Sequence, residues 1–497
     1  MNNPESSQPR RVAIIGGGIT GLTAAYILQK GARQAGLALT FTLFESAARP
    51  GGKILTETCD GFVVEGGPDS FLLQKPWAAQ LAQELGLEGE LIGTNPGQRK
   101  LYVVNRGRLT PMPDGLMLII PTRFMPFITS PLISWPGKLR MGLELLIPRR
   151  ADNADESVGA FIRRRLGREA LEKIAEPMMS GIHVSDLERQ SLLGTFPRFR
   201  SVEMQHGSLI RGMLAQKRAA ARSGQPGASR TDDSWKTSMF VTLRGGLNRL
   251  VDALAGALQD GEVRTSCAVT AIQPEPGGGF WITSQEGQRT FADALIMASP
   301  ASASAGLTAP FAPELSRGLA AIRYVSTATV SLAYRSSDWN TSIQGVGFIA
   351  PRREKRRISA CTLTSTKFGH RAPQDKVLVR CFVGGPGREG DLDQSDAGII
   401  ADARAEIGQL LGIQADPVLA RVYRWPNGNA QYDVGHLDRV RQLHELCAEF
   451  PGLYLTGSAY EGIGIPDCIH QGQQTAGKVL TFLAERQPVQ PQLLPTG

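Results

Sequence analysis

The sequence lacks most of the short patterns that mark common catalytic and metal-binding classes. Its six cysteines are scattered and form no C-x-x-C pair, which disfavours a zinc or thioredoxin-like centre and favours a reducing compartment. It contains no H-E-x-x-H motif and no Ser-His-Asp order. We therefore expect no metal site, and we assign no catalytic acid or base.

Long apolar runs are also missing. The first eleven residues, MNNPESSQPRR, are polar and contain no apolar segment of the kind that a secretory signal needs. The longest uncharged stretch near the apolar middle runs from Phe124 to Gly137 and is broken by Pro126, Pro131 and Pro136. It is shorter than the roughly 18 to 20 apolar residues that span a bilayer. These absences predict a cytoplasmic protein.

Composition is that of an ordinary globular protein. The 497 residues are 42% hydrophobic and 20% charged, which excludes bulk disorder, and the length suggests roughly three structural units. Basic residues number 54 against 46 acidic ones, but 17 basic and 10 acidic residues lie between Lys138 and Arg230, so the rest is nearly neutral. Because the excess is confined to one segment and no nucleic-acid motif is present, we expect no nucleic-acid partner.

The N-terminus carries a dinucleotide-binding pattern. An apolar run typical of a buried parallel strand, Val12 to Ile15, is followed by GGGITG and then by a predicted helix from Leu22 to Lys30. In this setting the glycines allow the backbone and the helix N-terminus to face a pyrophosphate. A second predicted strand, Leu39 to Phe44, ends at Glu45, close to the position of an acid that binds a ribose hydroxyl.

Three further glycine-rich segments favour a long dinucleotide such as FAD over a nicotinamide. RPGGKI begins at Arg49, and VVEGGPDS ends at Ser70. Near the C-terminus, a predicted strand from Leu453 to Thr456 precedes a glycine-rich loop and a helix predicted from Cys468. We expect the two ends of the chain to close around one cofactor. The alternative is that these glycines form plain turns without a ligand.

The chain resembles the FAD-dependent protoporphyrinogen and coproporphyrinogen oxidases, which are relatives of the monoamine oxidases. The likeness runs from about Arg11 to Leu480. It is carried by RVAIIGGGITGL with FES and RPGGKI, by VVEGGPDSF, by GVGFIAPRREKRRISACTLTSTKFGHRAP with VRCFVGG, and by LYLTGSAYEGIGIPDCIHQG. The third segment is the most specific to this family. The segment EPMMSGIHVSD also resembles a family element.

The resemblance implies roles for individual residues. Those implied along FAD are Gly16, Gly17, Gly18, Ile19, Thr20 and Gly21 at the pyrophosphate, Glu45 and Ser46 at the ribose, and Lys53, Gly67, Pro68, Asp69 and Ser70 beyond it. Val269, in a strand predicted from Cys267 to Ile272, would contact the adenine, and Trp425, Ser458, Ile463, Gly464 and Ile465 would enclose the isoalloxazine. Val346, Thr362 and Phe382 would line the substrate pocket. Asn105 stands where the eukaryotic type has a substrate-pairing arginine, which leaves the choice of porphyrinogen open.

The expected fold is α/β, with a Rossmann-like FAD domain, a mixed-sheet substrate domain and a helical domain. The FAD domain is predicted to be discontinuous, over 1–89, 240–300 and 451–485, with strands at Phe280 to Thr283 and Leu295 to Ala298 joining its sheet. The substrate domain would hold 90–110 and 301–450, and the helical, basic and apolar domain 111–239. We expect an exposed loop at Gly224 to Ser229 and a frayed tail over 486–497.

Two charged regions suggest partners. Apolar residues from Met117 to Ile128 precede Trp135 and a group of cations, a combination that suits the inner face of an anionic membrane. The alternative is a helix pair packed into the core with hydrated charges. A run from Arg352 to Arg357 could attract propionates, or it could be a solvated hairpin. The cations of the first region are Lys138, Arg140, Arg149 and Arg150.

The resemblance implies oxidation of protoporphyrinogen IX to protoporphyrin IX in heme biosynthesis. Six electrons would leave in three hydride transfers to flavin, and oxygen would yield hydrogen peroxide. Coproporphyrinogen III is the alternative substrate. Two other functions stay open: a flavin amine oxidase or carotenoid desaturase, and a flavin-free protein that binds lipidated partners. A ferrochelatase-type enzyme is an expected pathway partner, and the sequence does not determine the oligomeric state.

Overall fold

A five-stranded parallel sheet draws its strands from both ends and the middle of the chain. The computed structural model describes residues 8–98, 100–117, 119–121, 123–222 and 234–486. The strand order is β12-β2-β1-β16-β22, with all neighbours parallel. The strands are β1 (Arg10–Ile15), β2 (Leu39–Phe44), β12 (Gly261–Arg264), β16 (Ala294–Met297) and β22 (Leu453–Leu455). This arrangement confirms the predicted Rossmann-like class.

Both faces of this sheet are buried, as its apolar central strand requires. Val12 and Ile14 of β1 pack into one core, and Ala13 and Ile15 pack into the core on the opposite face. On the first face lie α1 (Ile19–Ala35), α2 (Trp77–Glu84), α11 (Asn248–Gly256) and α17 (Ile465–Ala484). On the second lie α12 (Ala301–Thr308), α13 (Pro313–Ala320), α16 (His436–Ala448) and a three-stranded sheet of β13 (Val269–Pro274), β14 (Phe280–Ser284) and β15 (Arg289–Ala292).

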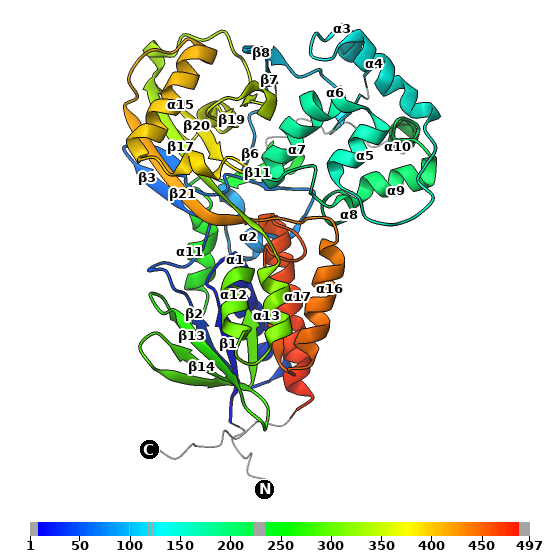
Figure 1. The fold of residues 1–497 in the computed structure, drawn as a ribbon. Coiled ribbons are helices and arrows are strands. Elements are labelled where there is room, and N and C mark those ends of the chain that lie inside the picture. The colour runs from blue at the N-terminus through cyan, green and yellow to red at the C-terminus, as the bar shows by residue number, and fades with distance from the viewer. Residues whose placement is uncertain (1–7, 99, 118, 122, 223–233, 487–497) are drawn as a thin grey trace.

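The helices α1 and α17 lie side by side although they belong to opposite ends of the chain (Figure 1). A Cβ on Gly472 would come within 2.6 Å of the Thr20 carbonyl oxygen, and one on Gly31 within 2.4 Å of Leu480. Because the Gly472 contact is with backbone, it is open only to glycine. The expected meeting of the two chain ends is therefore confirmed.

A seven-stranded sheet forms the second body, at the upper left of Figure 1. Its order is β21-β17-β20-β19-β18-β7-β8, and all pairs are antiparallel except β18 with β7. The helix α15 (Asp396–Leu411) covers one face. The strands are β7 (Leu101–Asn105), β8 (Arg108–Pro111), β17 (Tyr324–Arg335), β18 (Gly347–Ile349), β19 (Ala360–Thr362), β20 (Lys376–Gly384) and β21 (Leu419–Ala430).

Helices build the third body, at the upper right of Figure 1. They are α3 (Phe124–Thr129), α4 (Trp135–Gly142), η2 (Leu143–Leu146), α5 (Val158–Arg165), α6 (Arg168–Ala170), η3 (Leu171–Ala175), α7 (Glu176–His183), α8 (Leu192–Thr195), α9 (Pro197–His206) and α10 (Leu209–Arg222). Their core contains Phe161, Ile174 and Met179. No helix in the described part of the chain is both long and apolar enough to span a bilayer.

Two small antiparallel sheets complete the fold. The strands β3 (Thr56–Cys59) and β4 (Phe62–Glu65) form a hairpin. A small sheet joins β5 (Phe71–Leu72), β11 (Phe240–Leu243) and β6 (Leu91–Gly93). The hairpin ends at Glu65, so it delivers the glycines of VVEGGPDS to the region between the two large sheets.

Several sequence-based boundaries differ from the structure. The segment expected to begin the helical unit is instead a hairpin of β9 (Leu116–Met117) and β10 (Ile120–Pro121), because proline cannot continue a helix interior. The final helix begins at Ile465 and not at Cys468, since Pro466 is accepted in a first turn. The strand β14 belongs to the three-stranded sheet and not to the nucleotide sheet. The loop at 224–229 and the tail at 487–497 lie outside the described residues.

Candidate active site

The turn between β1 and α1 leaves room for a ligand on its outer side only. Cβ atoms on Gly16 and Gly21 would meet backbone atoms at 2.9 and 2.0 Å, whereas one on Gly18 would meet nothing within 4 Å. Gly18 is the N-cap residue of α1, and no side chain caps this end of the helix. The uncapped helix N-terminus, with Ile19 and Thr20 in its first turn, therefore offers N–H groups to an anion in the space beside Gly18.

The expected ribose and adenine residues come together beside this turn. The Glu45 carboxylate accepts from the backbone N–H of Gly17 at 2.8 Å and of Ala47 at 2.8 Å. The adjacent Ser46 hydroxyl lies 3.4 Å from the same carboxylate. The Cys267 N–H donates to the Glu45 carbonyl at 2.9 Å, just before the strand that begins at Val269. The two segments thus form one wall.

Lys53 lies where the glycine loops meet. A Cβ on Gly52 would come within 3.3 Å of the Gly18 Cα, and one on Gly67 within 1.7 Å of the Lys53 carbonyl oxygen. Burial lowers the pKa of the Lys53 ammonium, and no described residue forms a hydrogen bond or ion pair with it. An anionic ligand nearby, such as a dinucleotide would supply, would offset this burial and favour the charged form of Lys53.

The carbonyl of Gly66 receives three donors from the seven-stranded sheet. The Trp425 indole donates at 2.9 Å, the Thr329 hydroxyl at 2.9 Å and the Arg380 guanidinium at 3.3 Å. Arg380 also donates to the Gly67 carbonyl. These contacts hold the segment from Gly66 to Ser70 against the sheet.

An ion pair secures the far end of the same segment. Lys367 lies 2.9 Å from the Asp69 carboxylate, which also accepts from the Ser70 hydroxyl at 2.7 Å. Burial alone would raise the pKa of Asp69, but Lys367 and Arg380 together lower it well below its usual range. Asp69 is therefore ionised. The sequence analysis assigned no role to Lys367 or Arg380, although both stand in the family-specific KFGHRAP and RCFVGG segments.

The C-terminal loop carries the remaining residues that are expected at the cofactor. The Tyr432 hydroxyl donates to the Ser458 carbonyl at 3.0 Å and accepts from the Gly462 N–H at 2.8 Å. Gly464, next to Ile463 and Ile465, is the N-cap residue of α17, and no side chain caps this end of the helix. Gly472 lies against Thr20 and Gly31 against Leu480, so α1 and α17 run in the same direction. This second uncapped helix N-terminus therefore lies at the same end of the pair as that of α1.

A second ion pair marks the start of α17. The Lys75 ammonium lies 2.6 Å from the Asp467 carboxylate in the first turn. Burial, together with the positive charge of Lys75, lowers the pKa of His183 to about 4. The sequence analysis missed this group, because Lys75, His183 and Asp467 lie in three separate parts of the chain.

Two of the expected substrate residues, Thr362 and Phe382, share one face of the seven-stranded sheet. Phe382 pairs with Ala360 in register, and Thr362 pairs with Arg380, so these side chains lie on the face that meets Gly66. Val346 adjoins them, since its carbonyl accepts from the Leu363 N–H at 2.9 Å. Asn105 lies further across the sheet, and its side-chain oxygen accepts from Arg353 at 2.7 Å.

These features fit a dinucleotide that carries a flavin. Two uncapped helix N-termini, an unpartnered cation at Lys53 and open space at Gly18 suit an extended anionic ligand. The profile of the family described as "Flavin containing amine oxidoreductase" matches residues 19–480. The chain belongs to this family and is an FAD-dependent oxidoreductase.

Individual proteins within this family are similar to the chain over nearly its whole length. The coproporphyrinogen III oxidase of Bacillus subtilis strain 168 is 38% identical over 479 residues, which cover 96% of this chain and 99% of that protein. The chloroplastic protoporphyrinogen oxidase of Oryza sativa is 26% identical, with 95% of this chain and 88% of that protein covered. A protein from Exiguobacterium sp. 255-15 with a crystal structure is 31% identical in sequence to this chain, and the two structures superpose with a TM-score of 0.83. The match covers 95% of this chain and 99% of that one.

Proposed function

We propose that this enzyme oxidises coproporphyrinogen III to coproporphyrin III. The observation that carries the proposal is the 38% identity, over nearly the whole of both chains, to an enzyme named for that substrate, against 26% to a plant protoporphyrinogen oxidase. Protoporphyrinogen IX, which the sequence analysis placed first, becomes the second candidate. Both are porphyrinogens, so the proposed reaction class is the same.

The residues around the site suit binding and orientation more than proton transfer. FAD, when bound, supplies the two-electron acceptor. Phe382 and Thr362 offer a surface for a tetrapyrrole macrocycle, and the contacts of Trp425 fix that surface relative to the glycine segment. His183, with a pKa of about 4, is neutral near pH 7. The product is aromatic, so the reaction does not need a strong base.

The test is turnover of coproporphyrinogen III and protoporphyrinogen IX side by side, under air, with purified yellow enzyme. Product is read from its red fluorescence, and hydrogen peroxide is measured in the same samples. We expect coproporphyrinogen III to have the higher kcat/KM and peroxide to form in proportion to turnover. A higher kcat/KM for protoporphyrinogen IX would reverse the assignment. Absence of red emission with either substrate would remove the proposed function and favour an amine oxidase or desaturase.

We further propose that the helical body docks on an anionic membrane surface. Large apolar side chains are exposed on α3, α4 and η2, a concentration that soluble surfaces rarely carry. Trp135 is 66% exposed and Leu146 is 76% exposed. The full set is Met125, Ile128, Trp135, Leu139, Leu143, Leu145 and Leu146.

Three cations beside this patch donate hydrogen bonds to backbone carbonyls. Lys138 donates to the carbonyls of Ile128 and Ser130, Arg140 to carbonyls at the end of α5, and Arg149 to the Met204 carbonyl. Carbonyl partners do not neutralise a cation, so the apolar patch lies in a positive field. Arg150 differs, because it lies 2.8 Å from the Asp152 carboxylate.

Sedimentation with liposomes tests the docking. We expect binding to vesicles with anionic lipid, weaker binding at high salt, and loss of binding in the Trp135→Ser, Leu139→Ser double variant. Leu437→Ser on α16, which removes a side chain that is 41% exposed elsewhere, is the matched control. Equal binding of the double variant and the wild type, or no binding by either, would contradict this part of the proposal.

A further inference from the structure

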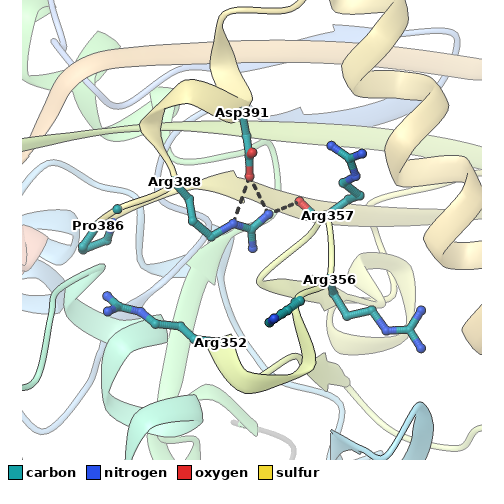
Figure 2. A pocket seen from close by; sticks show the side chains of 8 residues that line it. Arg352, Arg356, Arg357, Pro386, Arg388 and Asp391 are labelled. Carbon is teal, nitrogen blue, oxygen red and sulfur yellow. Dashed lines mark hydrogen bonds and ion pairs between the residues drawn. The ribbon is translucent and has the colours of Figure 1, made fainter.

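A cationic pocket of about 520 Å³ opens at the end of the seven-stranded sheet (Figure 2). Its wall comes from two loops, one between β18 and β19 and the other after β20. The charged side chains that line it are Arg352, Lys355, Arg356, Arg357, Arg388 and Asp391. With several cations and a single carboxylate in its lining, the pocket has the charge of an anion-binding site.

Two of these cations are held firmly by the protein. The Arg388 guanidinium lies 2.9 Å from the Asp391 carboxylate and donates to the Arg357 carbonyl at 2.8 Å, as Figure 2 shows. Arg356 donates to Gln409 at 2.7 Å and lies 3.3 Å from Glu406. These short contacts make Arg388 and Arg356 part of the pocket wall.

The other three cations are free to accept an anion. The Arg352 guanidinium is 3.6 Å from the carboxylates of both Glu176 and Asp186, too far for a strong hydrogen bond. Arg357 is 64% exposed and lies 3.9 Å from Asp402. Lys355 is exposed, and its ammonium group makes no hydrogen bond or ion pair with the described residues. Exposed pairs at such distances contribute little energy, so an incoming carboxylate can replace them.

The loop that carries these cations is itself fixed. The Arg357 N–H donates to Glu406 at 2.8 Å. Glu354 accepts from the backbone N–H groups of Arg106 and Gly107 at 3.0 Å each, and Arg353 donates to Asn105. Asn105 therefore helps to hold the loop in place. A fixed loop loses little conformational freedom when a ligand binds.

The pocket adjoins the face that carries the substrate residues. The strand β20 runs from Arg380, at the glycine segment, through Phe382 to Gly384, and then directly into the pocket wall. The strand β19 leads from the cationic loop to Thr362. A Cβ on Gly385 would lie 3.5 Å from Val184, the residue after His183. The pocket thus continues the substrate face toward solvent.

We propose that Arg352, Lys355 and Arg357 bind propionate carboxylates of the tetrapyrrole substrate, an inference that rests on the proposed function. Guanidinium groups pair with carboxylates through two parallel hydrogen bonds, and an ammonium adds a point charge. Coproporphyrinogen III carries propionates at positions where protoporphyrinogen IX carries vinyl groups. The pocket therefore favours coproporphyrinogen III, because its extra carboxylates replace uncharged substituents.

The test compares the Arg352→Gln, Lys355→Gln, Arg357→Gln triple variant with the wild type. We expect KM for coproporphyrinogen III to rise about tenfold or more, as loss of charged hydrogen bonds predicts, with kcat little changed. The KM for protoporphyrinogen IX should rise less. The Kd of coproporphyrin III for the oxidised enzyme, measured by fluorescence quenching, should rise in parallel and lose much of its salt dependence. Arg317→Gln on α13, which removes an exposed arginine that lies 3.2 Å from Glu314, is the matched control.

The outcomes separate this proposal from the one on which it rests. A triple variant with wild-type Kd, KM and salt dependence, beside a wild type that oxidises coproporphyrinogen III, would overturn the pocket assignment and leave the function standing. An equal rise in KM for both substrates would overturn the claim of selectivity. A wild type that oxidises neither porphyrinogen would remove the function and the pocket assignment together. Retention of the yellow flavin spectrum by the variant shows that it is folded.

Discussion

The indole nitrogen of Trp425 donates to the carbonyl of Gly66 at 2.9 Å, across 359 residues of sequence. Through this bond the seven-stranded sheet contacts the glycine segment of the nucleotide-binding body. Thr329 and Arg380 donate to the same carbonyl, so three strands of the sheet share one anchor. The position of the seven-stranded sheet relative to the glycine segment therefore depends on a short piece of backbone.

Replacing Trp425 with phenylalanine should loosen this anchor. The variant keeps an aromatic ring but loses one partly buried hydrogen bond, which contributes about 1 kcal/mol. We expect weaker retention of FAD during dialysis and a lower thermal midpoint. Trp281→Phe is the matched control, since it loses an indole bond of 2.9 Å to Glu275 in the three-stranded sheet. Equal FAD retention in the two variants would show that the Gly66 anchor does not support the cofactor site.

Gly18→Ala should separate folding from cofactor binding. A Cβ at this position meets no protein atom within 4 Å, and the backbone has φ of −68°, so alanine fits without strain. The added methyl would occupy the space that we assign to the pyrophosphate. We expect a folded, colourless protein, measured by circular dichroism and by FAD titration. Gly306→Ala, also open to solvent at Cβ, should bind FAD normally. Normal FAD affinity in Gly18→Ala would place the pyrophosphate elsewhere.

Asp69→Asn should destabilise the fold strongly. Both Asp69 and Lys367 are largely buried, with side-chain exposures of 16% and 15%. Neutralising the carboxylate leaves Lys367 and Arg380 as uncompensated buried cations, at a cost of about 3 kcal/mol. Urea unfolding measures this change. Asp375→Asn, which breaks a pair with Lys376 in which Asp375 is 74% exposed, should cost less than about 1 kcal/mol. Similar losses in the two variants would mean that burial does not strengthen the Asp69 pair.

The local parts of the fold could be predicted from the sequence. The strand β2 has the predicted bounds, because apolar residues bounded by breakers identify a buried strand. The GGGITG pattern predicted the turn at Gly18 between a strand and a helix, and the structure has this turn. The ends of helices were predicted less accurately. The helix α1 runs to Ala35, five residues beyond the predicted end at Lys30. Its end is set by Gly36 in a left-handed conformation, a cap that depends on one backbone angle.

Contacts between distant segments could not be predicted. The donors to Gly66 come from three strands, and periodicity does not indicate which strands meet. Likewise, the sequence left open whether the apolar segment near Trp135 is buried or exposed, and the structure shows a 66% exposed indole. The partners of Lys138 and Arg140 are backbone carbonyls, which carry no sequence signal at all. Such features follow from tertiary packing alone.

His183 predicts how stability changes with pH. Burial and the Lys75 ammonium lower its pKa to about 4, from about 6.5 in an unfolded chain. Because the unfolded state binds the proton more readily, the free energy of unfolding should decrease as the pH falls from about 6.5 to about 4. His183→Gln removes the titrating group and should flatten this part of the profile. Urea midpoints measured between about pH 7 and about pH 5 provide the comparison. His444→Gln on α16, a surface site 3.7 Å from Glu461, should leave the acid-side loss in place. If the His183→Gln profile is as steep as that of the wild type, the loss of stability arises from other groups, and His183 is not held neutral by its surroundings.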